Sequence, residues 1–181
     1  MSVGIIADRE LIASRVESIA SELRRDLGGT CPLVVGVLKG AMPFLSDLSK
    51  AMDLDLELDM LGLTRFGEGG KVSLAIDVAT PLEGRHVVLV EDLVDTGLTL
   101  RSVRSMLEAR GPASVTVVSL LDRRARRLVE VPVDHAAFVV GDEFVIGYGL
   151  DWEGRYRNLR DLWGVLDLAA FAATPPELER V

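Results

Sequence analysis

The chain has 181 residues, 49% of them apolar and 27% charged, and its formal net charge at pH 7 is -8. This composition suits one folded domain with a substantial core and excludes disorder throughout the chain. Because an acidic surface repels the phosphate backbone, a general nucleic-acid binder is disfavoured.

Helices and strands alternate in the first third of the chain. Apolar residues recur at helical spacing over 8–27, and two glycines then end the predicted helix. The unbroken apolar run 33–38 is typical of a strand buried on both faces. A second helix is predicted over about 43–52. Apolar and acidic residues alternate over 54–63, which predicts a strand with one face in water.

The same alternation continues toward the C-terminus. The Gly-rich polar stretch 64–71 predicts a mobile loop, and 99–110 predicts a helix. Further strands are predicted over 72–76, 87–90, 115–121 and 136–140. Short apolar strands that alternate with helices indicate βαβ units. We therefore expect an α/β fold with a mainly parallel, twisted sheet flanked by helices.

The remaining segments bear on domain organisation. The segment 141–166 is irregular and is expected to form a small cap with the N-terminus. The tail 169–181 contains two consecutive prolines, has little to pack against and is expected to be flexible. We therefore predict a single domain over 1–168, with a small subdomain, and a flexible tail.

Cysteine usage and hydropathy bear on the compartment. The one cysteine, Cys31, allows no internal disulfide and precedes an apolar run, so we expect a buried thiol and a reducing compartment. The N-terminal residues do not form a signal peptide. No apolar stretch approaches the roughly 20 residues that cross a bilayer. We expect a cytoplasmic protein that binds neither membrane nor nucleic acid.

One stretch carries most of the chemical information, Val87-Val-Leu-Val-Glu-Asp-Leu-Val-Asp-Thr-Gly-Leu-Thr-Leu100. It predicts a buried strand with two acids at its carboxyl end, the edge at which open α/β sheets bind ligands. The turn 95–99 brings backbone N–H groups and two hydroxyls to a helix N-terminus, which suits a phosphate monoester. Glu91 and Asp92 are suited to accept hydrogen bonds from ribose hydroxyls and to hold the hydrated Mg ion that a diphosphate brings.

Simpler interpretations of these residues stand beside that one. Acids are common at strand ends, and Asp95 alone would serve as a helix cap. The string is neither the Gly-x-x-x-x-Gly-Lys phosphate loop nor the Gly-x-Gly-x-x-Gly dinucleotide fingerprint. The basic run 123–127 is most simply a solvated face, and His86 and His135 are most simply structural.

Taken whole, the string resembles the motif that binds phosphoribosyl pyrophosphate (PRPP) in type I phosphoribosyltransferases, and it is most similar to that of the hypoxanthine-guanine group. The similarity spans about 5–165, with three further matches in the same order. They are Val37-Leu-Lys-Gly40, Ser119-Leu-Leu-Asp-Arg-Arg124, and Asp142-Glu-Phe-Val-Ile-Gly-Tyr-Gly-Leu-Asp-Trp152 followed by Arg155-Tyr-Arg-Asn158. The resemblance implies the type I phosphoribosyltransferase fold, with a hood built from the N-terminus and 141–166.

The resemblance also implies an activity. It is the Mg-dependent transfer of the 5-phosphoribosyl group from PRPP to N9 of hypoxanthine or guanine, a step of purine salvage. Pyrophosphate is released and a purine nucleoside monophosphate is formed. Members of the family are usually dimers or tetramers, so we expect a homo-oligomer.

Roles in PRPP binding follow from the resemblance residue by residue. Glu91 and Asp92 would bind the ribose hydroxyls and share the metal with Asp151. Asp95 would be the general acid or base near N7 of the purine, which suits a carboxylate whose pKa is lifted toward neutrality by burial. The 5-phosphate would be bound, mostly through backbone groups, by Asp95, Thr96, Gly97, Leu98 and Thr99. Pyrophosphate would be bound by Lys39, Gly40 and Arg157.

Other positions would bind the base or close the site. Phe144 would stack on the purine, Val145 would offer backbone groups to its edge, and Arg123 would donate to O6. The family usually has Lys in place of Arg123, and the two are not equivalent, which leaves the base preference open. Arg65-Phe66 stands where the family's mobile loop usually carries Ser-Tyr, which closes over PRPP and excludes water.

Two other functions remain open on the sequence. The first is a phosphoribosyltransferase for another base, such as xanthine or uracil, although the stretch 142–151 favours 6-oxopurines. The second is a non-catalytic sensor of PRPP or nucleotides that regulates transcription by binding RNA. The net charge of -8 and the retention of Asp95 argue against that sensor.

Overall fold

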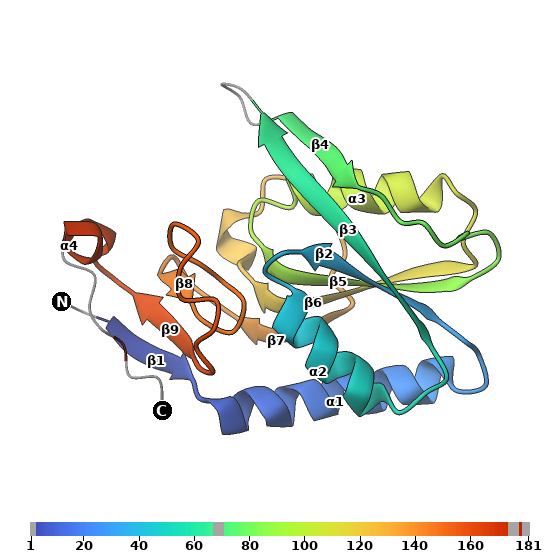
Figure 1. Ribbon diagram of the computed structural model, residues 1–181, viewed down its shortest axis with the longest axis horizontal. Coiled ribbons are helices and arrows are strands. Elements are labelled where there is room, and N and C mark those ends of the chain that lie inside the picture. The colour runs from blue at the N-terminus through green and yellow to red at the C-terminus, as the bar shows by residue number, and fades with distance from the viewer. Residues whose placement is uncertain (1–2, 67–70, 174–177, 179–181) are drawn as a thin grey trace.

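The computed structural model describes residues 3–66, 71–173 and 178 (Figure 1). Within them the strands form two sheets, of six strands in the order β4-β3-β2-β5-β6-β7 and of three in the order β1-β9-β8. The larger sheet contains β2 (Leu33–Leu38), β3 (Glu57–Phe66), β4 (Lys71–Ile76), β5 (His86–Val94), β6 (Ser114–Asp122) and β7 (His135–Val139). The smaller sheet contains β1 (Val3–Ala7), β8 (Phe144–Ile146) and β9 (Leu162–Val165).

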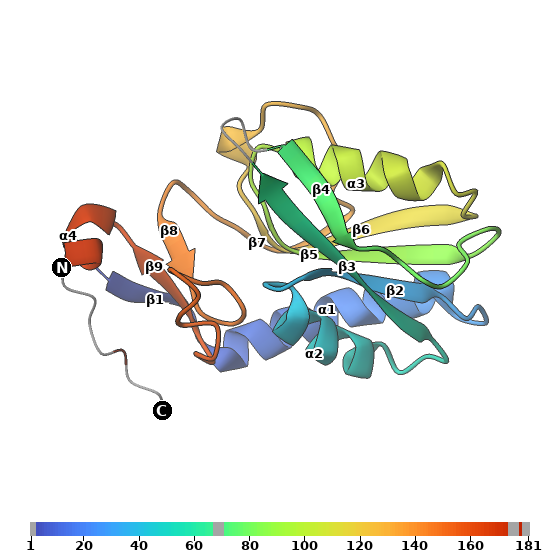
Figure 2. The same ribbon diagram turned by 45° about the horizontal axis from the view of Figure 1, so that its top comes forward.

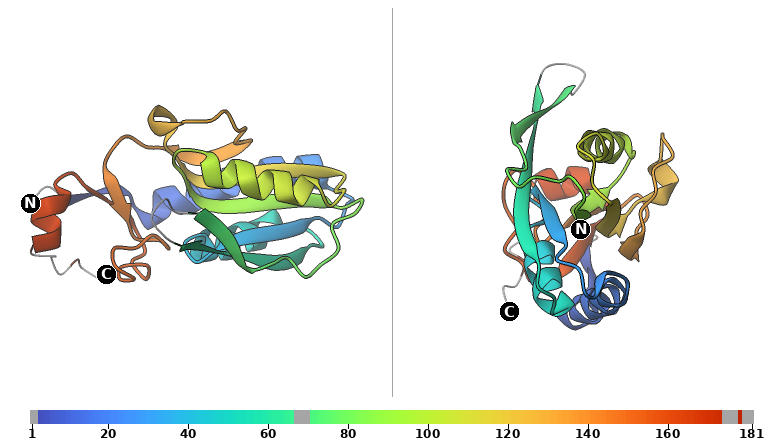
Figure 3. Two further views of the ribbon diagram at one scale, coloured as in Figure 1. Left: turned by 90° about the horizontal axis from the view of Figure 1, so that it is seen from above. Right: turned by 90° about the vertical axis from the view of Figure 1, so that its right-hand side faces the viewer.

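The larger sheet is mainly parallel, as the alternation of strands and helices predicts. The neighbours β3, β2, β5, β6 and β7 all run parallel, and β4 is antiparallel to β3 at one edge. Three helices cover this sheet: α1 (Arg9–Leu27), α2 (Met42–Met52) and α3 (Leu98–Glu108). Figure 3 shows α1 and α2 on one face and α3 on the other. The predicted α/β class is confirmed.

The two central strands feed two cores. Side chains on a strand point alternately to opposite faces. Accordingly, Val34 and Val88 pack in the core under α1 and α2, whereas Leu33 and Leu89 pack in the core under α3. A strand that is covered on both faces has no polar side, so its sequence is an unbroken apolar run. The prediction that 33–38 is such a strand is confirmed.

Two strands differ in extent from the prediction. The ladder between β5 and β6 continues to Val94, so Glu91 and Asp92 lie within β5 rather than beyond it. Apolar periodicity misses this extension because the acids interrupt the apolar run. The strand predicted over 54–63 begins instead at Glu57, the residue that pairs with Leu33 at the start of β2.

Within the stretch 64–71, residues 64–66 and Lys71 lie in strands rather than in a loop. Arg65 and Phe66 of β3 pair with Val72 and Lys71 of β4, and the residues 67–70 lie outside the described part of the chain. The loop prediction is wrong for 64–66 and for Lys71. Backbone pairing with a neighbouring strand holds them, and a local excess of glycine does not report that pairing.

The smaller sheet joins the N-terminus to the segment 141–166. Strand β9 pairs antiparallel with both β1 and β8. Figure 2 shows this sheet as a lobe beside the larger one, with the helix α4 (Leu168–Ala173) at its outer end. We call this lobe the hood. It unites elements from the two ends of the described chain, because β9 pairs with both β1 and β8.

Two expectations about packing are wrong. The tail is predicted to have little to pack against, but Phe171 of α4 is fully buried, with its ring 6.1 Å from Trp152 and 5.8 Å from Tyr156. Those aromatics are supplied by the hood. Residues 174–177 and 179–181 of the tail lie outside the described chain. Cys31, expected to be buried, is exposed because it precedes β2 rather than belonging to it.

Among the described helices, none combines the length and apolarity that a membrane span requires.

Candidate active site

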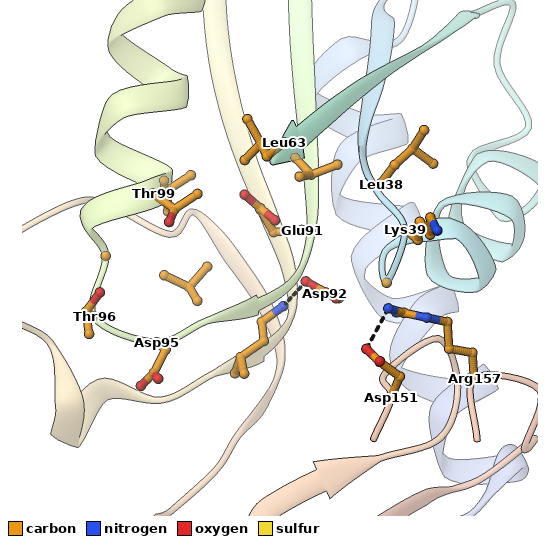
Figure 4. Close-up of a pocket in the computed structure, with 16 residues that line it drawn as sticks. Leu38, Lys39, Leu63, Glu91, Asp92, Asp95, Thr96, Thr99, Asp151 and Arg157 are labelled. Carbon is orange, nitrogen blue, oxygen red and sulfur yellow. Dashed lines mark hydrogen bonds and ion pairs between the residues drawn. The ribbon is translucent and has the colours of Figure 1, made fainter. Parts of the chain in front are cut away.

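A cleft of about 630 Å³ lies at the carboxyl ends of β2 and β5. Its walls are the loop after β2, the end of β5 with its following turn, and the loop between β8 and β9 (Figure 4). The cleft unites most of the residues that the sequence singles out: Lys39, Gly40, Glu91, Asp92, Asp95, Thr96, Gly97, Thr99, Asp151 and Arg157. They come from three separate stretches that meet at the ligand-binding edge of the sheet.

The two acids of β5 form the floor of the cleft. Glu91 is only 5% exposed, and burial, followed by the charge of Asp92, raises its pKa well above the usual range. Burial also raises the pKa of Asp92, although the backbone N–H of Leu93 donates to this carboxylate and opposes the rise. A buried acidic pair of this kind is stabilised by a bound cation or by hydroxyl donors.

The turn after β5 leads directly into α3. Gly97 precedes the helix with φ +82°, a left-handed conformation that favours glycine. Thr96 and Thr99 line the cleft on either side of it. The helix N-terminus therefore presents backbone N–H groups to the cleft, an arrangement that binds anions. Leu98 does not line the cleft, and its side chain is largely exposed.

The carboxylate of Asp95 lies between cations and has one oxygen without a partner. Its Oδ2 atom is 3.7 Å from Nη1 of both Arg123 and Arg126. Its Oδ1 atom is buried and has no hydrogen-bond partner among the described residues. A buried acceptor of this kind is costly unless a ligand supplies a donor. The position therefore suits a group that receives a proton from a ligand.

The loop after β2 approaches the acids without a side chain in between. A Cβ atom at Gly40 would overlap the carboxylate of Asp92, and one at Gly149 in the hood would overlap the carbonyl of Gly40. The peptide bond between Leu38 and Lys39 is cis. Glycine at both positions lets core and hood meet beside the cleft, where Lys39 is the cationic wall.

The hood contributes an ion pair to the opposite wall. The Nη2 atom of Arg157 lies 2.5 Å from Oδ1 of Asp151, and its Nη1 atom donates to the carbonyl of Gly149 at 2.6 Å. The other oxygen of Asp151 accepts from the backbone N–H of Gly154 at 2.7 Å. Both side chains point into the cleft in Figure 4. The pair places one cation and one carboxylate opposite the acids of β5.

The donor set bears on the predicted metal. The described residues contain no cluster of three or more His, Cys, Asp or Glu that would hold an ion alone. Three carboxylates, from Glu91, Asp92 and Asp151, nevertheless line one cleft. Mg²⁺ usually binds through one or two carboxylates and completes its shell with water and substrate phosphates. The residues thus fit a magnesium ion that arrives with a diphosphate.

Known proteins are similar to this chain in sequence and in fold. The family model described as a phosphoribosyl transferase domain matches residues 2–153. The chain belongs to the phosphoribosyltransferase family. It is 37% identical to the hypoxanthine-guanine phosphoribosyltransferase of Streptococcus pneumoniae, over 86% of this chain and 88% of that protein. It is 38% identical to the hypoxanthine-guanine phosphoribosyltransferase of Bacillus subtilis, over 92% of this chain and 94% of that protein. The solved hypoxanthine phosphoribosyltransferase of Trypanosoma cruzi, in complex with the product IMP, matches with a TM-score of 0.85 at 34% identity, covering 90% of this chain and 93% of that one.

The residues predicted to bind the purine do not line the cleft of this phosphoribosyltransferase. Arg123 is buried and donates from Nε and Nη2, at 2.7 Å each, to the carbonyls of Gly141 and Glu143 in the hood segment. Phe144 packs edge-to-face on Trp152 at 5.4 Å between ring centroids. Arg123 thus ties the end of β6 to the segment that carries the predicted base contacts. Of the residues predicted for the mobile loop, Arg65 and Phe66 end β3, where their backbone pairs with β4.

Sequence patterns did not indicate that Arg127 of the phosphoribosyltransferase contacts the turn of the active site. Apart from Arg123, to which the resemblance gives a role at the purine, the run 123–127 is predicted as a solvated face. That prediction fits Arg124 and Arg126, which are exposed, but is wrong for Arg127. Arg127 pairs with the buried Asp122 and donates to the backbone carbonyl of Asp95 at 3.0 Å. The one signal in the sequence was Asp122, an acid directly before the basic run, which indicates an ion pair. The sequence does not show which arginine of the run is its partner.

Proposed function

We propose that this phosphoribosyltransferase transfers the 5-phosphoribosyl group of PRPP to N9 of hypoxanthine or guanine. The reaction releases pyrophosphate and forms the purine nucleoside monophosphate. One observation carries the proposal: the β5 acids, the turn before α3 and the cations Lys39 and Arg157 all line a single cleft. These groups suit the three parts of PRPP, which are a ribose with two hydroxyls, a monophosphate and a diphosphate. The curated relatives support a 6-oxopurine as the acceptor.

The first step is the binding of PRPP. Glu91 and Asp92 accept hydrogen bonds from the ribose hydroxyls, which supply donors to two carboxylates whose pKa values are raised by burial. The turn from Asp95 to Thr99 binds the 5-phosphate through N–H groups and hydroxyls, with the helix dipole of α3 behind it. Both contacts fix the ribose ring before the reaction.

The second step breaks the bond between C1 of the ribose and the pyrophosphate oxygen. The bonding electrons leave with pyrophosphate, positive charge develops on the ribose ring, and N9 of the purine forms the new bond to C1. Lys39 and Arg157 neutralise the leaving group, together with the backbone of Gly40. Bound Mg²⁺, held by Glu91, Asp92 and Asp151, would supply further charge neutralisation.

Asp95 manages the proton that the purine loses. Its unpartnered Oδ1 atom is the acceptor for a ring N–H near N7. The nearby guanidinium groups of Arg123 and Arg126 orient the carboxylate through the other oxygen. Arg123 also has its Nη1 group directed to this region, from which it would donate to O6. Phe144 stacks on the base and Val145 offers its backbone.

Several finer properties belong to the same proposal. The end of β3 with Arg65 and Phe66 closes over PRPP and excludes water. The enzyme is a homo-oligomer, a dimer or tetramer, and acts in the cytoplasm without nucleic acid. The family resemblance supports the oligomer, and the acidic net charge and single cysteine support the rest.

The test is a set of initial rates with PRPP, MgCl₂ and one base at a time: hypoxanthine, guanine, xanthine, adenine or uracil. Turnover of hypoxanthine or guanine, with release of pyrophosphate and loss of the rate in EDTA, is the expected result. Turnover of xanthine or uracil alone would change the acceptor. If PRPP binds and no base reacts, the chain is a PRPP sensor, and salt-sensitive RNA retention on filters would then identify the regulator.

A further inference from the structure

The turn that carries Asp95 is bound from behind by a segment that follows β6. The carbonyl of Thr96 accepts hydrogen bonds from the backbone N–H groups of Leu128 at 2.9 Å and of Val129 at 3.4 Å. The preceding carbonyl, of Asp95, accepts from Nη1 of Arg127 at 3.0 Å. Two successive carbonyls of the turn are therefore held by residues 127–129, which do not line the active-site cleft.

Holding these carbonyls orients the N–H groups of the same peptides. In a planar trans peptide the N–H points opposite to the C=O. Because the carbonyls of Asp95 and Thr96 are bound from behind, the amides of Thr96 and Gly97 are directed to the other side, where both residues line the cleft. Neither N–H has an acceptor among the described residues. The turn thus keeps two donors available for an anion.

Arg127 itself is fixed by a buried carboxylate. Its Nη2 atom forms a close ion pair with Oδ1 of Asp122, at the end of β6. The Asp122 side chain is 3% exposed and that of Arg127 16%. The Arg127 stem also packs on the turn, since a Cβ at Gly97 would lie 2.9 Å from its Cδ atom. A charge-assisted pair with little water around it holds the guanidinium in one place.

Arg124 provides an internal comparison. It donates from Nε to the other oxygen of Asp122 at 2.8 Å, but its side chain is 68% exposed. Among the described residues, no hydrogen bond or ion pair joins Arg124 to the turn. The two arginines therefore share one carboxylate, and of the two only Arg127 also donates to the carbonyl of Asp95.

We propose that Arg127, held by Asp122, is a positioning residue that keeps the 95–97 turn in the conformation that binds the 5-phosphate of PRPP. This inference deepens the proposed function and rests on it. Arg127 contacts no substrate atom in this role. It removes the need to order the turn when the phosphate binds, and preorganisation of that kind raises affinity.

The test compares R127M with R124M. Each substitution keeps an unbranched side chain, removes one cation and leaves Asp122 the other arginine. PRPP binding by titration calorimetry without base is expected to weaken about 10- to 100-fold in R127M, the loss typical of one charge-assisted hydrogen bond. R124M is expected to stay within about threefold. In steady state, R127M should raise the KM for PRPP more than that for hypoxanthine.

Other results would overturn the positioning role. Equal PRPP affinity in the two variants would do so, as would a lower melting temperature in R127M with no selective change in PRPP binding. If R127M does not fold, R127K replaces it, because one ammonium cannot keep both contacts and should weaken PRPP binding by a smaller factor. Wild-type protein that binds PRPP without turnover would contradict the proposed function but not this inference. Wild-type protein that binds no PRPP would contradict both.

Discussion

At the scale of single residues, charge and burial at the cleft explain why acids occupy it. Glu91 is buried and Asp92 is partly buried, both have raised pKa values, and Asp95 has an unpartnered oxygen. Each arrangement is unfavourable in the free protein and becomes favourable when a ligand supplies donors or positive charge. Such residues cannot be explained by the stability of the fold, which indicates selection for binding.

The role of Asp95 is tested by D95N. The amide keeps the shape of the side chain but cannot take up a proton at neutral pH. We expect kcat to fall about 10²- to 10⁴-fold, the usual contribution of general acid–base catalysis, while PRPP affinity changes little. Steady-state kinetics together with PRPP titration measure the two effects. A kcat like that of wild type would exclude Asp95 as the acid or base.

Arg123 is tested by R123K, which installs the residue usual in the family. One ammonium cannot donate to the carbonyls of both Gly141 and Glu143 and also remain near Asp95. We expect the KM for hypoxanthine to rise about tenfold, the loss of roughly one charged hydrogen bond, with little change in the KM for PRPP. An unchanged KM for hypoxanthine would show that the tether to the hood does not matter.

The buried Glu91 makes the stability of the free protein depend on pH. Its pKa is raised in the folded state above the ordinary 4.5, so the unfolded chain binds fewer protons between the two values. The protonated carboxyl makes its full contribution to folding stability below pH 4.5, and this contribution is lost as pH rises through the folded pKa. E91Q has no carboxyl to ionise, so its stability does not fall in this way. In urea unfolding without ligands, the free energy of unfolding of E91Q should rise relative to that of wild type as pH rises above 4.5. A difference between the two free energies that does not change with pH would contradict the raised pKa of Glu91.

At the scale of elements, the hood is held together by aromatic packing that includes α4, the last helix of the described residues. Phe171 of α4 contacts Trp152, which in turn contacts Phe144 of β8. The helix therefore supports, through one intermediate ring, the strand predicted to stack on the purine. A helix of only six residues, all of them apolar, has no stability of its own and depends on this contact.

The aromatic packing is tested by F171A. Removing a fully buried Phe leaves a cavity and should lower the free energy of unfolding by about 3–5 kcal/mol. L166A, at a neighbouring position where the side chain is exposed, is the control and should change it by less than about 0.5 kcal/mol. Urea denaturation measures both. Similar values for the two variants would mean that α4 does not pack on the hood in solution.

At the scale of the whole molecule, the site exists only where the larger sheet and the hood meet. The junction is the contact between the Gly40 carbonyl of the core and Gly149 of the hood, beside Lys39 and Arg157. Gly149 has φ +102°, so an alanine there would meet both backbone strain and the neighbouring carbonyl. The placement of Lys39 relative to Arg157, the two cations proposed to bind pyrophosphate, depends on this contact.

The junction is tested by G149A. The added methyl should push the hood away from the core loop. We expect kcat/KM for PRPP to fall at least about tenfold, because small displacements of binding groups strongly lower the reaction rate. G84A is the control, because Gly84 also has a positive φ, +69°, but open space around its Cβ position. It should lose some thermal stability and keep kcat/KM. Equal activity in both variants would show that the junction tolerates displacement.

Three features could be predicted from the amino-acid sequence alone: the parallel sheet, its two strands buried on both faces, and the turn before α3. Their signals are contiguous: an unbroken apolar run reports a strand covered on both faces, and the string 87–100 places acids, turn and helix start in order. The tertiary structure decided the rest. Arg127 meets Asp95 across 32 positions, Gly40 meets Gly149, and Phe171 gains its aromatic partners from the hood. No local periodicity encodes such pairs, because they form only when separate elements pack and desolvate the groups between them.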